Sequence, residues 1–108
     1  MTDSTHLPTS CIELHGELVR AQVPSQLARW QAAFRVFLTQ FSALGSAPPE
    51  LTVSLRGVER VDTAGLAVLL HIAREASQNK TDILFKDAPA QLLALAELSS
   101  LTKLLRFA

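Results

Sequence analysis

The sequence predicts an α/β domain, because a strand pattern, a helix pattern and a second strand pattern follow one another in its second half. Leu51 to Leu55 alternate between apolar and polar residues, as a strand with one buried face does. The segment from Asp62 to about Gln78 then carries apolar residues at helical spacing. Asp82 to Phe85 has the length and composition of a short buried strand. A strand–helix–strand unit of this length predicts two parallel strands joined by a right-handed crossover.

Length and composition indicate one globular domain. The chain has 108 residues, of which 48% are hydrophobic, which is enough for a core of its own. Ten basic and ten acidic residues cancel, so bulk charge favours neither nucleic acid nor an anionic membrane surface. We expect residues 1–10 to form a flexible lead and residues 11–108 to form the domain.

The sequence also predicts a cytoplasmic protein. The lead shows no signal-peptide pattern, and no apolar run approaches the length of a membrane span. The single cysteine, Cys11, excludes an internal disulfide and fits a reducing compartment. Any association with a membrane is therefore expected to go through a partner.

The first half of the chain predicts a hairpin and a long helix. Cys11 to Leu14 alternate as a strand does, His15 to Glu17 resemble a turn, and Leu18 to Ala21 read as the returning strand. Ser25 is a suitable cap for a helix that runs to about Leu44. Apolar residues spaced by three and four predict its buried stripe: Leu27, Trp30, Phe34, Phe37, Leu38, Phe41 and Leu44.

The last quarter of the chain predicts one more helix and an ambiguous end. Asp87-Ala88-Pro89 start the helix, because proline tolerates the first turn, where its missing N–H is not needed. Leucines between Leu92 and Leu98 give the helix a broad apolar face, and Ser99-Ser100 ends it. Leu101 to Phe107 fits either a last helical turn or a short edge strand, and both interpretations stay open.

The helix that begins near Asp62 is the most informative stretch. Asp62 and Thr63 are capping residue types, because a side-chain oxygen there can accept a hydrogen bond from a free N–H of the first turn. Leu66, Leu69 and further apolar residues at helical spacing predict its core stripe. Gly65 costs about 1 kcal/mol relative to alanine inside a helix. We expect the close approach of another backbone or of a partner to offset that cost.

The other flank of this helix is apolar where a solvent-facing flank would be polar. Its members are Ala64, Ala67, Val68 and His71. A contiguous strip of this kind beside a helix end indicates a surface for another protein. The alternative is that His71 is an exposed helix residue without a function.

Patterns of catalysis and of metal binding are absent from the sequence. The histidines at 6, 15 and 71 and Cys11 are scattered, and no Gly-x-Ser-x-Gly elbow or Walker phosphate loop occurs. Cys11 is expected to be an inert, partly buried small residue. We therefore expect no enzymatic activity, no cofactor and no metal.

The run Asp62-Thr63-Ala64-Gly65-Leu66 resembles the signature of the STAS domain family, in which Asp-Ser/Thr-x-Gly-Leu opens a helix after a central strand. The resemblance covers Ile12 to Phe107. It implies a small mixed sheet of four to five strands, with three to four helices packed mainly on one face. Val19 and Ser54 replace acids that many family members carry. Within the family, the run from Val61 to Ile72 is most similar to the accessory subunits of phospholipid-transport ABC complexes.

This resemblance implies a non-catalytic subunit that binds and regulates or stabilises the ATPase subunit of such a transporter, whose task is lipid asymmetry of the outer membrane. The implied partner-binding residues are Asp62, Thr63, Ala64, Gly65, Leu66, Ala67, Val68 and His71. The subunit would lie at the inner membrane only through its partner, and would bind no nucleic acid.

Two alternatives from the same family stay open. An anti-sigma factor antagonist would bind a kinase-like anti-sigma factor and be switched off by phosphorylation of Thr63. The replaced acids at Val19 and Ser54 weaken this interpretation. A stand-alone nucleotide-binding module is disfavoured because the sequence has no phosphate loop.

Overall fold

The computed structural model describes residues 11–43, 45, 50–101 and 104–108, without the side chains of residues 41–43. The elements follow one another as β1 (Cys11–Leu18), a 3-10 turn (Arg20–Gln22), α1 (Val23–Ala43), β2 (Leu51–Val61), α2 (Thr63–Gln78), β3 (Ile83–Lys86) and α3 (Ala90–Leu98). Strands and helices therefore alternate, as the sequence predicts for an α/β domain. The expected lead, residues 1–10, lies outside the described residues.

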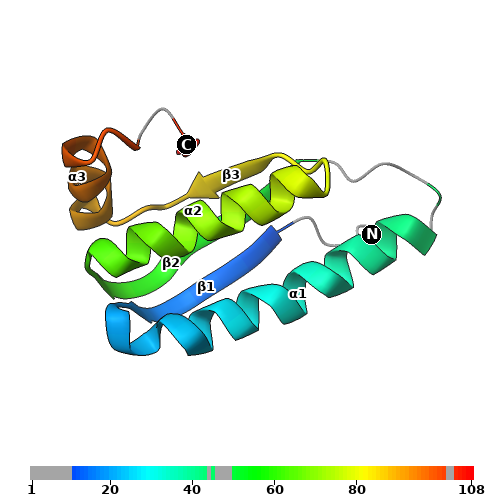
Figure 1. Ribbon diagram of the computed structural model, residues 1–108, viewed down its shortest axis with the longest axis horizontal. Helices are drawn as coiled ribbons and strands as arrows, with labels where there is room; N and C mark the ends of the chain where they lie inside the picture. Colours follow the sequence, from blue (N-terminus) through cyan, green and yellow to red (C-terminus); the bar gives the residue numbers. More distant parts are fainter. Residues whose placement is uncertain (1–10, 44, 46–49, 102–103) are drawn as a thin grey trace, which may run out of the picture.

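The described strands form one parallel sheet with β2 in the middle. β1 pairs with one edge of β2 and β3 with the other. All three strands therefore end at the same side of the molecule, and α1, α2 and α3 begin there, at the left of Figure 1. α1 packs on β1 and beside α2, whereas α2 contacts β1 and β2. The predicted parallel crossover from β2 through α2 to β3 is confirmed.

The predicted hairpin at the start of the chain is wrong. Residues 11–18 form one strand, and His15 lies within it. Gly16 has φ +88°, and the pairing of β1 with β2 shifts register between Gly16 and Glu17. A glycine of this conformation serves a β-bulge as well as a turn, so the strand bends without reversing. The Gln26 side chain holds the bulge, because its Nε2 donates to the carbonyl oxygens of His15 at 2.9 Å and Glu17 at 3.0 Å.

The predicted mixed sheet of four to five strands is also wrong for the described residues, which contain three strands, all parallel. The predicted hairpin would have supplied one more strand, Leu18 to Ala21, which the structure does not contain. β2 also extends further than the strand predicted over Leu51 to Leu55, because Arg56 to Arg60 continue it as far as Val61. The described α-helices number three, within the expected range.

The chain end contains a feature of each predicted alternative, a helical turn and a contact at the edge of the sheet. Leu101 lies in a 3-10 turn. Phe107 forms an isolated parallel bridge with Phe85 of β3, where the Phe85 N–H donates to the Arg106 carbonyl oxygen at 2.8 Å. The bridge extends the sheet beyond β3 by one residue pair and is too short to form a strand.

The aromatic stripe of α1 lies in the core, as predicted. Trp30, Phe34 and Phe37 are buried, with ring centroids 4.7 Å apart for the first pair and 5.9 Å for the second. Leu27 and Leu38 are half-buried, and the side chains predicted at 41 and 44 lie outside the described residues. The helix begins at Val23, not after a cap at Ser25, because the 3-10 turn leads directly into it.

The other two helices differ in how they are covered. The buried residues of α2 are Gly65, Leu66, Val68, Leu69, Ile72 and Ala76. In α3 only Leu92 and Ala96 are buried, and Pro89 lies at the N-cap, just outside the helix. None of the described helices combines the length and the apolar character that crossing a bilayer requires.

Candidate protein-docking site

The start of α2 is fixed by the Asp62 carboxylate. Its Oδ1 accepts hydrogen bonds from the backbone N–H groups of Ala64 at 2.8 Å and Gly65 at 3.3 Å, and its Oδ2 accepts from the N–H of Arg20 at 3.1 Å. The Asp62 N–H in turn donates to the Leu18 carbonyl oxygen at 3.2 Å. One side chain thus caps α2 and ties it to the turn that leads into α1.

Gly65 is required by the close approach of β1. A Cβ atom at this position would lie 2.5 Å from the carbonyl oxygen of Leu18 and 2.9 Å from Cγ1 of Val61. Backbone atoms cannot move aside as a flexible side chain would. Of the two reasons expected for this glycine, another backbone or a partner, the structure shows the backbone of β1.

Thr63 is the first residue of α2, and its side chain is exposed. Asp62, not Thr63, is the N-cap. No hydrogen bond of the Thr63 hydroxyl to another described residue is found. The hydroxyl is therefore accessible at the positive end of the helix dipole.

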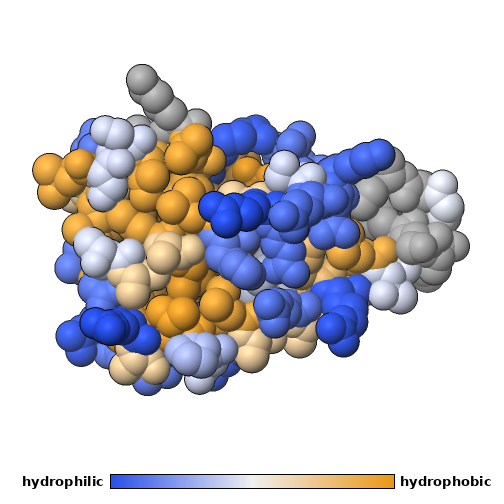
Figure 2. All heavy atoms as spheres, viewed as in Figure 1, coloured by the Kyte–Doolittle hydropathy of each residue, from blue (hydrophilic) through white to orange (hydrophobic). Residues whose placement is uncertain are grey.

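An apolar groove runs beside Thr63 between α1 and α2. One wall is the strip predicted from the sequence, Ala64, Ala67, Val68 and His71. The other wall is contributed by Arg20 and by the start of α1, with Val23, Pro24 and Leu27. The groove has a volume of about 490 Å³. Figure 2 shows hydrophobic residues gathered at the side of the molecule where the helices begin.

The residues predicted to bind a partner differ in accessibility. Thr63, Ala67 and His71 are exposed, and Asp62 and Ala64 are half-buried. Three others are buried and lie beneath this surface: Gly65, Leu66 and Val68. Gly65 and Leu66 therefore support the site from the core without lining the groove, whereas Val68 is buried and lines it.

Sequence reasoning missed the wall that α1 provides. Leu27 was assigned to the core stripe, and Val23 and Pro24 precede the helix cap that was predicted at Ser25. The apolar character of these residues was visible, but their position opposite Ala67 depends on how α1 packs against α2. This position could have been predicted only if the packing of α1 beside α2 had been known.

The far end of the groove is polar. The Trp30 indole Nε1 donates to Oε1 of Glu75 at 2.8 Å, and His71 Nε2 lies 3.5 Å from the same oxygen. Glu75 therefore links α2 to the buried aromatic stripe of α1. The position of His71, and with it this end of the groove, is restrained by a contact that spans both helices.

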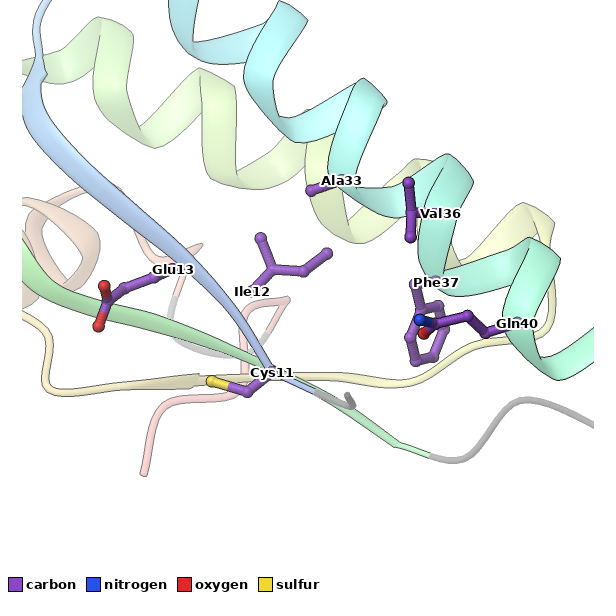
Figure 3. Close-up of a pocket in the computed structure, with 7 residues that line it drawn as sticks. All are labelled: Cys11, Ile12, Glu13, Ala33, Val36, Phe37 and Gln40. Carbon is purple, nitrogen blue, oxygen red and sulfur yellow. The ribbon is translucent and has the colours of Figure 1, made fainter. Parts of the chain in front are cut away.

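A second hollow lies between the start of β1 and the second half of α1 (Figure 3). It has a volume of about 360 Å³, and Ile12 lies in it between the strand and Ala33. Cys11 on its rim is exposed, which corrects the expectation of a partly buried cysteine. Cys11 is the first residue of β1, and the alternation of residues along a strand does not determine whether a side chain at its end is covered. The described residues include no cluster of side chains suited to a metal ion.

A comparison with known families identifies a match that covers most of the chain. The family described as "Mlab, STAS domain" matches residues 4–106. STAS domains are typically non-catalytic binding domains, and no catalytic family is indicated. No curated protein sequence matches the chain. The match spans nearly the whole chain and includes the helix start fixed by Asp62, so this protein belongs to the MlaB-type STAS domain family.

Proposed function

We propose that this chain is a non-catalytic subunit that binds the ATPase subunit of an Mla-type phospholipid-transport ABC transporter and regulates or stabilises it. The proposal depends on one observation: Thr63 is exposed at the start of α2, and this helix start is held in place. Asp62 caps it, the Arg20 N–H binds the same carboxylate, and Gly65 packs closely against β1. Membership of the MlaB-type family supports the choice of partner.

The fixed geometry of the helix start favours binding over chemistry. The Asp62 carboxylate accepts hydrogen bonds from three backbone N–H donors, which gives it the role of a helix cap. A surface that is ordered before binding loses little conformational entropy when a partner docks. The exposed Thr63 hydroxyl and the neighbouring small side chains of Ala64 and Ala67 allow another backbone to come close.

Regulation of the ATPase would follow from differential binding. A subunit shifts the equilibrium between two ATPase conformations only if it binds one of them more tightly. Phospholipid transport, and through it the lipid asymmetry of the outer membrane, would be affected through the ATPase. The chain would be cytoplasmic and would reach the inner membrane only through this partner.

The decisive experiment is a pull-down of an Mla-type ATPase subunit from the same organism, with wild-type protein and with Thr63→Glu. We expect the added charge and bulk to abolish capture and to lower ATP hydrolysis by the assembled complex. Thr39→Glu is the matched control, because Thr39 is exposed on α1 and lies outside the groove. Capture that survives both Thr63→Glu and Thr63→Ala would refute the docking role of this helix start.

The exposure of Thr63 also supports one alternative, an anti-sigma factor antagonist. A kinase could reach the hydroxyl, and a phosphate at a helix N-terminus would be tolerated by the helix dipole while blocking a tight contact. Co-expression with a kinase-like anti-sigma factor and mass spectrometry of the peptide that contains Thr63 would test it. An unmodified peptide together with capture of the ATPase would favour the transporter role.

A further inference from the structure

We propose that the groove between α1 and α2 binds the apolar face of an acidic amphipathic helix of the partner, as a contact separate from the one at Thr63. This inference rests on the proposed function, since it assigns a second part of the same docking surface. It adds residues of α1 and of the preceding turn to the interface, with Leu27 and Arg20 as the main ones.

The shape of the groove suits a helix. α1 and α2 pack beside each other, and the residues that line the groove extend from Val23 to Leu27 of α1 and from Ala64 to His71 of α2. Helix-in-groove recognition uses a few apolar anchors that enter such a channel between helices. Ala64 and Ala67 on one wall are small and leave room, whereas Leu27 and Val23 on the other wall offer aliphatic contact.

The charges around the groove select an acidic partner segment. Arg20 lies at one end, and Arg74 is exposed one turn beyond His71 at the other end. Neither arginine forms an ion pair with any described residue. The nearby acids are already engaged, Asp62 by backbone N–H groups and Glu75 by Trp30 and His71. The two arginine side chains are therefore the charged groups at the rim that lack a partner among the described residues, and they favour carboxylates on the helix that binds.

The first test fills the groove without touching the core. Ala67→Trp places a large side chain on an exposed position of the wall, and Ala32→Trp places the same side chain on an exposed position of α1 outside the groove. The affinity of each variant for the purified ATPase subunit is measured by isothermal titration calorimetry. We expect Ala67→Trp to weaken binding about tenfold or more and Ala32→Trp to leave it unchanged.

The second test concerns charge. Arg20→Glu is expected to weaken binding several-fold and to reduce its dependence on salt, because a rim charge acts mainly through steering and long-range attraction. Arg29→Glu is the matched control, because Arg29 is exposed on α1 and lines no part of the groove. Circular dichroism on each variant establishes that it is folded.

The outcomes separate this inference from the proposed function. Wild-type affinity in Ala67→Trp, combined with loss of binding in Thr63→Glu, would overturn the groove and keep the docking role of Thr63. Wild-type affinity in Arg20→Glu would overturn the acidic character of the bound helix. Displacement of the ATPase by sub-micellar oleate, without an effect of Arg20→Glu, would assign the groove to an acyl chain and overturn the inference. Retained binding in all variants would refute both contacts, the one at Thr63 and the one in the groove, whereas absence of binding by the wild-type protein would refute the proposed function itself.

Discussion

α2 and α3 both begin where a parallel strand ends, but polar contacts fix only the start of α2. The Asp62 carboxylate accepts three backbone N–H hydrogen bonds and ties α2 to the turn before α1. At the start of α3, Pro89 occupies the cap position without any side-chain hydrogen bond. The two helices therefore present apolar residues on backbones that are restrained to different degrees.

Exposure of apolar side chains alone would select the region near α3 and not the start of α2. The chain end near α3 exposes the larger apolar side chains, with Leu98 at 84% and Leu104 at 66%, whereas the groove beside α2 is lined mainly by small or half-buried residues. Singly exposed leucines are common on protein surfaces. What distinguishes the start of α2 is the combination of an accessible hydroxyl, a groove and a fixed backbone, which lowers the entropic cost of binding. The comparison can be tested by perturbing each region in turn.

The largest effect is expected from Gly65→Ala. Alanine normally stabilises a helix by about 1 kcal/mol relative to glycine. Here its Cβ would meet the Leu18 carbonyl oxygen at 2.5 Å, so β1 or α2 must shift. We expect a net loss of about 3 kcal/mol in the free energy of unfolding, the upper end of the range for overpacked sites. Urea denaturation followed by circular dichroism measures it.

Ser77→Ala is the control for this substitution, because Ser77 is exposed near the end of the same helix. Its effect should stay within about 0.5 kcal/mol. Equal stability of Gly65→Ala and the wild type would show that β1 does not restrain the start of α2, and the contrast with α3 would disappear.

A smaller effect is expected from Asp62→Ala. The substitution removes the cap of α2 and the acceptor for the Arg20 N–H, and loss of a cap lowers stability by about 0.5–2 kcal/mol. Asp62→Asn keeps a side-chain oxygen of similar capping strength, so it should retain most of that stability. Thermal unfolding of the two variants measures the difference. Equal destabilisation by both would mean that the negative charge, and not the hydrogen-bond acceptor, organises this corner.

The restrained region is also the one that the sequence predicted best. Asp62, Gly65 and the helix end near Gln78 could be predicted because capping and helical periodicity depend on residues close together in the chain. The conformational cost of Gly65 predicted the close approach of either another backbone or a partner. That the backbone belongs to Leu18 is a long-range fact that no local pattern contains.

The wrong predictions concern residues whose local sequence fits two different structures. Gly16 fits a turn as well as a bulge, and only the pairing of β1 with β2 decides between them. Val68 was assigned to a flank of α2 but is buried, because α1 covers a side of the helix that periodicity alone leaves open. The Val23 and Leu27 wall of the groove was missed for the same reason. Local chemistry thus predicts where elements begin and end, and packing decides which of their faces remain accessible.

The smallest effect is expected from Leu98→Gln on α3. The side chain is 84% exposed, so the substitution removes little buried apolar surface and should change stability by no more than about 0.5 kcal/mol. It should also leave the affinity for the ATPase subunit unchanged, whereas Ala67→Trp is expected to reduce it. Parallel calorimetric titrations of the two variants make the comparison. If Leu98→Gln weakened binding as strongly as Thr63→Glu, the docking surface would extend over α3, and a fixed backbone would no longer distinguish the binding region from the rest of the apolar surface.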